Sequence, residues 1–548
     1  MTKMVNPKQR YYLLIFLIFS ILIRAGFAIF VGPGNSDASN YTTYAYDIAY
    51  TGNFKLLFIP QSPGPVINLW VLLMSIFMFS IGSHFLTVAV ILTIIVNIMS
   101  LFVFYKLLNI YLSVEKSLLA TFILSILPLH IKISYNPSYE SFMILIVLLH
   151  LLFLIKYIKS GKYSHLITSA LSGSSLVLIH NTGYLFIFLS SLFMFYTSLN
   201  RSTFKKWLIF VIILCTIPLG QFLIWKINTG SFWPYLQFQK ELRINVHNQY
   251  LNMKSIPVTY FIKYFENFIR KFNPILFLYF FISLIHFKWL AKKKNYQIST
   301  LILISAVILF LLFLNLPQNY LTLGLIILIS TFLYFSSRLI EKYNVNELLL
   351  YSFYSIFIYM IIFLRPFPRG LNTRSYTNIQ CFALIVAVFL IFNGIRALKY
   401  ILIIGIIIIQ LTGISFSRFG LKDKVAFWFK TGTYGYYFEP WMPYYLLSPE
   451  LSDSLQLLNS LKNIDIKKRK IITNLFYGRF LGMKYQIPQS RILLIKNDDN
   501  YNKYLTEAEN NDIILLKEDI NLNLVNKYHL EKYKKTKNII VYLKKGFR

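Results

Sequence analysis

The sequence predicts an all-α polytopic membrane protein of about thirteen transmembrane helices, followed by a small extracytoplasmic α/β domain. Among its 548 residues, 56% are hydrophobic and 18% aromatic, and the mean hydropathy is +0.56, which is too apolar for a soluble enzyme. Long uncharged runs recur along residues 11–416. Along residues 417–548, helix-like segments such as Ser452 to Leu461 alternate with short β-rich runs at 470–473, 491–495, 513–516 and 539–543. We therefore expect a membrane domain, 1–416, and a second domain, 417–548.

The first apolar run, Tyr11 to Val31, is long enough to cross a bilayer, and no small-residue cleavage site follows it. We expect a retained helix rather than a signal peptide. Lys3, Lys8 and Arg10 precede this run, which favours a cytoplasmic N-terminus.

The stretch from Gly34 to Phe54 is the first polar sequence after that run, and it holds two carboxylates, Asp37 and Asp47. Its apolar positions recur at helical spacing: Tyr41, Ala45 and Ile48. Gly52 is a suitable helix stop. The pattern predicts a short polar loop leading into a helix at the membrane interface.

The run 65–82 decides the topology, because its length of about seventeen residues is near the lower limit for a crossing helix. If it does not cross, the later spans are 85–105, 117–135, 141–156, 165–181, 184–199, 206–227, 273–289, 298–315, 319–337, 347–364, 377–394 and 398–416. The basic clusters of the short loops then all face the cytoplasm. They are Lys106/Lys116, Lys156/Lys159/Lys162, Arg201/Lys205/Lys206, Lys292/Lys293/Lys294, Arg338/Lys342 and Arg396/Lys399. If 65–82 were counted as a span, every one of these clusters would lie outside the cell instead. We therefore predict a cytoplasmic N-terminus and an external C-terminus.

The formal charge of +34 does not indicate nucleic-acid binding, because the basic residues are scattered between apolar runs as topology signals and contacts for anionic lipid. The long loop 228–272 is the exception to the cytoplasmic placement of basic loops, because it would be external. Its basic residues include Lys240 and Arg243 and can serve an anionic substrate. Cys215 and Cys381 lie in apolar runs without metal or disulfide spacing, so we expect small buried residues.

Eight acidic residues precede position 417, and two of them suggest chemistry. Glu115, Glu341 and Glu347 fall in predicted cytoplasmic turns as surface or capping residues, and we expect Asp47 to be exposed on the interfacial helix. Asp37 and Glu140 instead lie just beyond the outer ends of spans, among aromatic residues, where a carboxylate needs a partner or a task. The structural alternatives are an Asx-turn for Asp37, and for Glu140 a helix start capped by Ser138.

Two outer carboxylates can serve proton-coupled transport, bind a metal, or accept the proton of an attacking hydroxyl. If the leaving group is a phosphate, that reaction needs positive charge beside it. Candidate cations are Arg24, Lys132, Lys240, Arg243, Arg365, Arg369 and Arg374. For each arginine the alternative is snorkelling to lipid headgroups.

The order of these residues resembles the membrane-embedded glycosyltransferases of the C-type fold (GT-C), which use polyprenyl-phosphate sugars and include protein O-mannosyltransferases and the lipid A aminoarabinose transferase. The resemblance rests on Arg24, on Asp37, Tyr41, Ala45, Ile48, Thr51, Gly52 and Phe54, on Pro63-Gly64-Pro65 and Gly82, on Pro128, Ser134 and Ser138-Tyr139-Glu140, and on Arg374-Ser375-Tyr376. It covers roughly residues 11–416, and an outer C-terminal domain is a feature of the aminoarabinose branch.

This resemblance implies that Asp37 is the first-loop catalytic acid and that Glu140 is a second acid that places the acceptor or a metal. It implies inverting attack at the anomeric carbon on the outer face. The implied substrate-binding residues are Arg24, Tyr41, His130, Tyr139, His180, Lys240, Arg243, Arg365, Arg369, Arg374 and Tyr376. The resemblance leaves open whether a divalent metal ion is used, and Asp37 and Glu140 are its only candidate ligands.

The sequence departs from the family at two places. Ala38 follows Asp37 where protein O-mannosyltransferases have a paired acid. His180-Asn181 stands where many relatives carry an Arg or Lys, so His180 either binds donor phosphate or is a capped core histidine.

We therefore predict a glycosyltransferase of the cytoplasmic membrane. Its partners would be a polyprenyl-phosphate sugar, with its tail beside 65–82, a lipid, glycan or protein acceptor, and membrane lipids, but no nucleic acid. The alternatives are a flippase for lipid-linked oligosaccharides, or another transporter, and a polysaccharide polymerase or ligase. The large outer domain and the lack of acidic or basic residues in the middle of the spans argue against a transporter.

Overall fold

The computed structural model describes residues 7–30, 36–55, 68–199, 204–232, 347–349, 351–352, 355–356, 380–393, 404, 458, 466–473, 487, 491–494, 504–509, 512–516, 522–535 and 540–544. The expected spans at 273–289, 298–315 and 319–337 lie outside these residues. So does nearly all of the expected helix-like segment Ser452 to Leu461.

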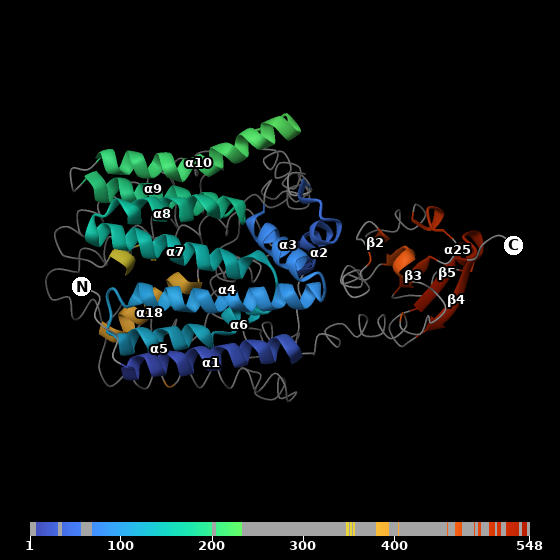
Figure 1. The fold of residues 1–548 in the computed structure, drawn as a ribbon, viewed down its shortest axis with the longest axis horizontal. Helices are drawn as coiled ribbons and strands as arrows, with labels where there is room; N and C mark the ends of the chain where they lie inside the picture. The colour runs from blue at the N-terminus through green and yellow to red at the C-terminus, as the bar shows by residue number, and fades with distance from the viewer. Residues whose placement is uncertain are drawn as a thin grey trace, which may run out of the picture.

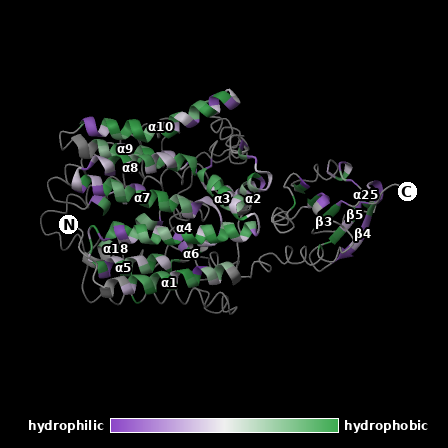
Figure 2. Cartoon of the chain, in the orientation of Figure 1, coloured by the Kyte–Doolittle hydropathy of each residue, from purple (hydrophilic) through white to green (hydrophobic). Residues whose placement is uncertain are grey.

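The N-terminal part is a bundle of apolar helices that run side by side (Figure 1). Its members are α1 (Pro7–Phe30), α4 (Phe85–Leu108), α5 (Val114–Ser125), α7 (Tyr139–Ser160), α8 (Tyr163–Ser175), α9 (Gly183–Leu199), α10 (Phe204–Thr229) and α18 (Gln380–Asn393). Among the described residues, four helices are long and apolar enough to cross a membrane: Tyr11–Ala28, Phe85–Leu108, Tyr139–Ser160 and Phe204–Asn228. Figure 2 shows apolar residues along the middle of these helices. The protein is therefore an integral membrane protein, mostly helical in the described part.

Helix α7 is central and α1 is peripheral. The apolar window of α7 is 78% buried inside the protein, whereas that of α1 is 17% buried. On α1 the exposed side chains Leu14, Ile18 and Leu22 follow each other at intervals of one turn. In a bilayer this exposed apolar stripe faces lipid rather than water.

Two short helices, α2 (Ser36–Thr51) and α3 (Leu69–Ile81), lie at the end of the bundle opposite the N-terminus (Figure 1). Asn68 caps the start of α3, and Gly82, with φ of 70°, ends it in the left-handed conformation that favours glycine. With 13 residues, α3 is about 20 Å long, shorter than the hydrocarbon core of about 30 Å. This length agrees with the expectation that the 65–82 run does not cross.

At the other end of the bundle, a buried carboxylate joins three segments. Glu347 accepts a hydrogen bond of 2.8 Å from the Tyr111 hydroxyl and pairs with Lys159 Nζ at 3.3 Å. Lys159 also lies 4.7 Å from the centroid of the Tyr111 ring. Glu347 was expected to be a surface or capping residue, and the surface position was wrong, because Glu347 is only 7% exposed and its charge is paired.

A second polar network joins α7, α8 and α9 in the interior. His150 Nδ1 lies 2.8 Å from the Ser169 carbonyl oxygen, and Nε2 lies 2.7 Å from Ser190 Oγ. Because a carbonyl oxygen only accepts, Nδ1 carries a proton and donates to Ser169. This ionisable residue in the middle of a span was not predicted, and its hydrogen bonds join the three helices.

The C-terminal part contains a mixed five-stranded sheet. Its strands are β1 (Ile471–Thr473), β2 (Ile492–Leu494), β3 (Ile513–Leu516), β4 (Leu530–Lys535) and β5 (Ile540–Lys544), in the order β2-β1-β3-β5-β4. Strand β1 is parallel to β2 and β3, whereas β5 is antiparallel to β3 and β4. The helix α25 (Leu522–Lys527) precedes β4.

Four of these strands confirm the β-rich runs of the sequence, and the fifth was not predicted. Strand β4, with the sequence LEKYKK, is exposed at all positions after Leu530. It lies at the edge of the sheet, where charged side chains discourage pairing with other chains. A polar edge strand lacks the apolar alternation on which such predictions depend.

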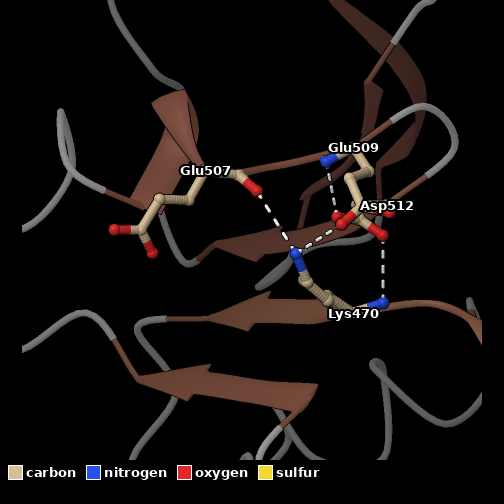
Figure 3. Close-up of polar contacts among 4 residues, drawn as sticks. All are labelled: Lys470, Glu507, Glu509 and Asp512. Atoms are coloured by element: carbon tan, nitrogen blue, oxygen red, sulfur yellow. Dashed lines mark hydrogen bonds and ion pairs between the residues drawn. The ribbon is translucent and has the colours of Figure 1, made fainter.

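A polar cluster holds the starts of β1 and β3 together (Figure 3). The buried Asp512 accepts backbone hydrogen bonds from Lys470 at 3.0 Å and from Glu509 at 2.7 Å. Lys470 Nζ donates to Glu509 Oε1 at 2.8 Å and to the Glu507 carbonyl oxygen at 3.4 Å. These bonds stabilise the turn that leads into β3.

Candidate functional site

Three segments that are distant in the sequence meet through their aromatic rings. Tyr139, the first residue of α7, stacks on His180, with ring centroids 4.2 Å apart and planes 4° apart. Tyr41 of α2 packs its ring at 69° against Tyr139, with centroids 5.7 Å apart. These three residues, here called the aromatic cluster, are all predicted substrate-binding residues, and the fold brings them together.

Asp37 lies in the first turn of α2, four residues before Tyr41. The sequence placed it in a loop before the helix, but α2 already begins at Ser36. The positive end of a helix favours an ionised carboxylate in its first turn. Asp37 is therefore one turn away from the residue of α2 that contacts Tyr139.

The rest of α2 follows the predicted pattern with one difference. Ala45 and Ile48 are fully buried, as their helical spacing indicates. Asp47 is half-buried rather than exposed, and its charge adds to burial in raising the pKa of Tyr44 to about 12.

Glu140 is the second residue of α7 and is 1% exposed. Its carboxylate accepts a hydrogen bond from the Ser138 hydroxyl. Ser138 stands at the N-cap position with extended backbone, yet its side chain makes no capping bond. The alternative in which Ser138 caps α7 is therefore wrong, because its hydroxyl is held by the carboxylate of Glu140 instead.

His180 has a defined tautomer. Its Nδ1 accepts the backbone N–H of Thr182 at 3.2 Å and lies 3.0 Å from the Thr182 hydroxyl. Because a backbone N–H only donates, Nδ1 carries no proton and the neutral ring holds its proton on Nε2. The half-buried His180 thus offers one N–H donor beside Tyr139.

Two residues at the start of α3 contact the same region, and the sequence analysis missed them. Asn68 Nδ2 donates to the carbonyl oxygen of Ile179 at 3.2 Å, and Trp70 Nε1 donates to that of Pro137 at 3.4 Å. The available signal was an asparagine directly before an apolar helical run, which is typical of an N-cap. It predicts the cap but not the contacts with distant segments.

Arg24 and His130 lie inside the bundle. Arg24 is fully buried, and it donates from Nε to Asn97 Oδ1 at 2.6 Å and from Nη1 to the Ser20 carbonyl oxygen at 3.1 Å. Its Nη2 donates to the Ser125 carbonyl oxygen at 3.3 Å and lies 2.9 Å from His130 Nδ1. Snorkelling of Arg24 to the surface is thereby overturned.

These bonds tie α1 to α4, α5 and the short helix α6 (Pro128–Ser134). His130 is equally buried and contacts Ser100 at 3.4 Å. In the described part of the chain neither residue contacts the aromatic cluster directly, although Asn97, the partner of Arg24, also donates to Ser141 Oγ in the first turn of α7 at 3.3 Å. Phosphate binding by Arg24 and substrate binding by His130 stay predictions.

Other predicted cations lie outside the described residues: Lys240, Arg243, Arg365, Arg369 and Arg374, together with Tyr376. The side chain of Lys132 is also not described. Within the described part of the chain no group of three His, Cys, Asp or Glu side chains could hold a metal ion. There the carboxylate of Glu140 accepts a hydrogen bond from the Ser138 hydroxyl, and a divalent metal ion held by Asp37 and Glu140 stays a prediction.

No protein-family model and no curated protein sequence matches this chain. Two solved structures do match in fold. ArnT from Cupriavidus metallidurans bound to undecaprenyl phosphate matches with a TM-score of 0.59 at 10% identity, over 98% of this chain and 99% of that chain. The same protein in the apo state matches with a TM-score of 0.57 at the same identity and coverage. The chain therefore has the GT-C fold of ArnT, the lipid A aminoarabinose transferase, which is the fold that its sequence resembles.

Proposed function

We propose that this protein is a membrane glycosyltransferase that moves a sugar from a polyprenyl-phosphate donor to a lipid, glycan or protein acceptor, with inversion at the anomeric carbon. The observation that carries the proposal is the aromatic cluster, with the buried Glu140 next to Tyr139 and Asp37 one turn before Tyr41. It lies on a fold shared with ArnT, which binds undecaprenyl phosphate. That fold supports a lipid-linked donor here.

The distribution of basic residues supports a site on the outer face of the cytoplasmic membrane. The last turns of α4 and α7 carry Lys106 and Lys159. Lys206 at the start of α10 lies 5.8 Å from the ring centroid of Tyr163 at the start of α8. This basic end is opposite the end that holds α2 and α3 (Figure 1). By the positive-inside rule the basic end is cytoplasmic and the aromatic cluster is external.

The same orientation agrees with thirteen spans, a cytoplasmic N-terminus and an external domain at 417–548. Figure 1 shows the C-terminal sheet beyond the end of the bundle at which α2 and α3 lie. In this arrangement the sheet would share an aqueous face with the site.

The reaction needs a base and a stabilised leaving group. The acceptor hydroxyl oxygen attacks the anomeric carbon, the bond from that carbon to the phosphate oxygen breaks, and polyprenyl phosphate leaves with the bonding electrons. Asp37 takes the hydroxyl proton as the new bond forms. Glu140, held by Ser138, accepts a hydrogen bond from the acceptor and orients it. Positive charge from the predicted outer arginines and lysines stabilises the phosphate.

The aromatic cluster fits the binding of a sugar phosphate. Tyrosine rings present flat apolar faces, and the Nε2–H of neutral His180 is a donor for a phosphate oxygen or sugar hydroxyl. The exposed apolar side of α3, with Ile76, Phe77 and Phe79, fits the polyprenyl tail. The donor would therefore lie between α3 and the aromatic cluster.

The test is transfer by the purified full-length protein in lipid nanodiscs. Defined polyprenyl-phosphate sugars are supplied with candidate acceptors, and released polyprenyl phosphate and glycosylated acceptor are measured by mass spectrometry. A glycosyltransferase cleaves the donor and releases one polyprenyl phosphate for each sugar transferred. A flippase moves the donor intact across a vesicle membrane, so movement without cleavage would contradict the proposal. Comparing surface glycolipids and glycoproteins with and without the gene identifies the acceptor.

A further inference from the structure

Asn68 makes hydrogen bonds in two directions. Its Oδ1 accepts the backbone N–H groups of Trp70 at 3.0 Å and Val71 at 3.1 Å, which caps the start of α3. Its Nδ2 donates to the carbonyl oxygen of Ile179 at 3.2 Å. The two N–H donors on Oδ1 fix the orientation of the amide. One buried side chain therefore caps the start of α3 and binds the residue directly before His180.

Trp70 makes the corresponding contact to the other half of the stack. It is fully buried, with its ring 5.4 Å from that of Phe142. Its Nε1 donates to the carbonyl oxygen of Pro137 at 3.4 Å, two residues before Tyr139. The first turn of α3 is thus bonded to both segments that supply the Tyr139–His180 stack.

The remainder of α3 has a buried side and an exposed side. Val71, Met74 and Met78 are buried, whereas Phe77 and Phe79 are 44% and 55% exposed. An exposed apolar face on a membrane protein contacts acyl chains. Helix α3 therefore connects a lipid-facing surface to the aromatic cluster through two side chains.

We propose that Asn68 and Trp70 are positioning residues, through which α3 holds Tyr139, Glu140 and His180 in the arrangement needed for sugar transfer. This inference rests on the proposed function. Neither residue touches the substrate in this proposal. Their bonds set the separation of the Pro137 and Ile179 segments, and that separation sets the stack and the place of Glu140. Losing a bond should lower kcat more than it changes KM for the donor.

Two variants remove one bond each while keeping the packing. Asn68→Asp keeps the cap acceptor for Trp70 and Val71, removes the Nδ2 donor, and places an oxygen against the Ile179 carbonyl. Trp70→Phe keeps an aromatic ring beside Phe142 and removes the Nε1–H. Ser75→Ala is the matched control, because the Ser75 hydroxyl bonds only within α3, to the Val71 carbonyl oxygen at 2.7 Å.

Hydrogen exchange followed by mass spectrometry reads the local effect without requiring activity. Asn68→Asp should speed exchange roughly fivefold in the segment 178–184 and leave 134–139 unchanged, as expected for the loss of one hydrogen bond. Trp70→Phe should show the reverse pattern. In the transfer assay, kcat should fall by roughly tenfold to a hundredfold in each variant, with KM for the donor within about twofold.

Three results would overturn the positioning role. The first is exchange at the wild-type rate in both segments of Asn68→Asp and Trp70→Phe. The second is faster exchange in these variants with unchanged kcat. The third is the same change in exchange and kcat in Ser75→Ala. If the wild-type protein transfers no sugar from any polyprenyl-phosphate donor, the proposed function fails. The exchange pattern of Asn68→Asp and Trp70→Phe then still decides whether α3 holds the two segments, so the two failures are distinguishable.

Discussion

The ring of Tyr139 lies flat on the imidazole of His180, with centroids 4.2 Å apart and planes 4° apart. Tyr139 opens α7, whereas His180 lies in the connection between α8 and α9, so the stack joins two segments that are about 40 residues apart in the chain. Because the backbone N–H of Thr182 donates to Nδ1 of His180, the proton of the ring is on Nε2. The stack holds this Nε2–H in place as a donor.

We expect His180→Phe to keep the stack and lose transfer activity. The phenyl ring can lie on Tyr139, but the variant lacks the Nε2–H donor. Turnover should fall by roughly tenfold to a hundredfold, as for the loss of one hydrogen bond to a charged group. His180→Gln, which has a donor without an aromatic ring, separates the donor from the stack. Equal activity of His180→Phe and wild type would show that His180 is only a packed residue.

We expect Ser138→Ala to reduce turnover, because its hydroxyl binds the carboxylate of Glu140 rather than capping α7. A serine that caps a helix contributes about 1 kcal/mol, and its loss would lower the thermal midpoint. Ser138 makes no capping bond, and its hydroxyl binds Glu140, so the variant should instead leave the carboxylate misplaced. The checks are the thermal midpoint and the rate of transfer. A destabilised but fully active variant would restore the capping role.

We expect Glu347→Leu to destabilise the end of the bundle opposite α2 and α3 without a direct effect on the chemical step. The variant leaves the Tyr111 hydroxyl without its 2.8 Å acceptor and Lys159 without its ion pair. A lost buried acceptor costs about 1–3 kcal/mol. Glu347→Gln keeps an acceptor for Tyr111, so its unfolding midpoint should lie between those of wild type and Glu347→Leu. The measurement is the unfolding midpoint in detergent, and an unchanged midpoint in Glu347→Leu would contradict this role.

The Lys470–Glu509 contact should stabilise the C-terminal sheet between mildly acidic and alkaline pH. The hydrogen bond from Lys470 lowers the pKa of Glu509, and the same bond raises the pKa of Lys470. The contribution of Glu509 is therefore present above its ordinary pKa of about 4.3 and is lost as the pH falls through its lowered value. That of Lys470 is present below about 10.4 and is lost as the pH rises through its raised value.

The measurement is hydrogen exchange around 470–473 and 509–516 across this pH range, with rates corrected for their intrinsic pH dependence. Glu509→Gln should remove the acid-side change while keeping a polar side chain. Because Glu509 is exposed, the effect is local and weakened by salt. Identical corrected pH profiles for Glu509→Gln and wild type would contradict the role of this contact.

The sequence predicted elements that have strong local signals. The basic clusters of the short loops all face the cytoplasm only if 65–82 does not cross, and α3 is indeed short. Runs rich in isoleucine and leucine predicted β1, β2, β3 and β5, but the polar edge strand β4 gave no such pattern. The early start of α2 at Ser36 was missed, because the same polar residues also favour loops.

The contacts of the site depend on long-range packing, which no local pattern encodes. Glu140 was identified from its position, but its bond to Ser138 was not predicted, because the local pattern offered only a capping role for that serine. Arg24 was predicted to bind the donor phosphate, with snorkelling to headgroups as the alternative, yet it is buried and bonded to Asn97 and His130, which lie 73 and 106 residues away in the chain. Asn68 carries a capping signal, whereas its bond to Ile179 joins residues 111 apart. Such pairs become visible only in the folded bundle.

The most direct test of the proposed function is single-turnover transfer by Asp37→Asn, compared with Asp47→Asn on the same helix. Both changes remove one negative charge from α2, but only Asp37 is assigned as the base. With a defined polyprenyl-phosphate sugar, we predict that Asp37→Asn slows transfer by at least about a hundredfold, as for the loss of a general base. Asp47→Asn should stay within about threefold of wild type, a spread that we take as typical of a change outside the chemistry. Normal transfer by well-folded Asp37→Asn would contradict the account.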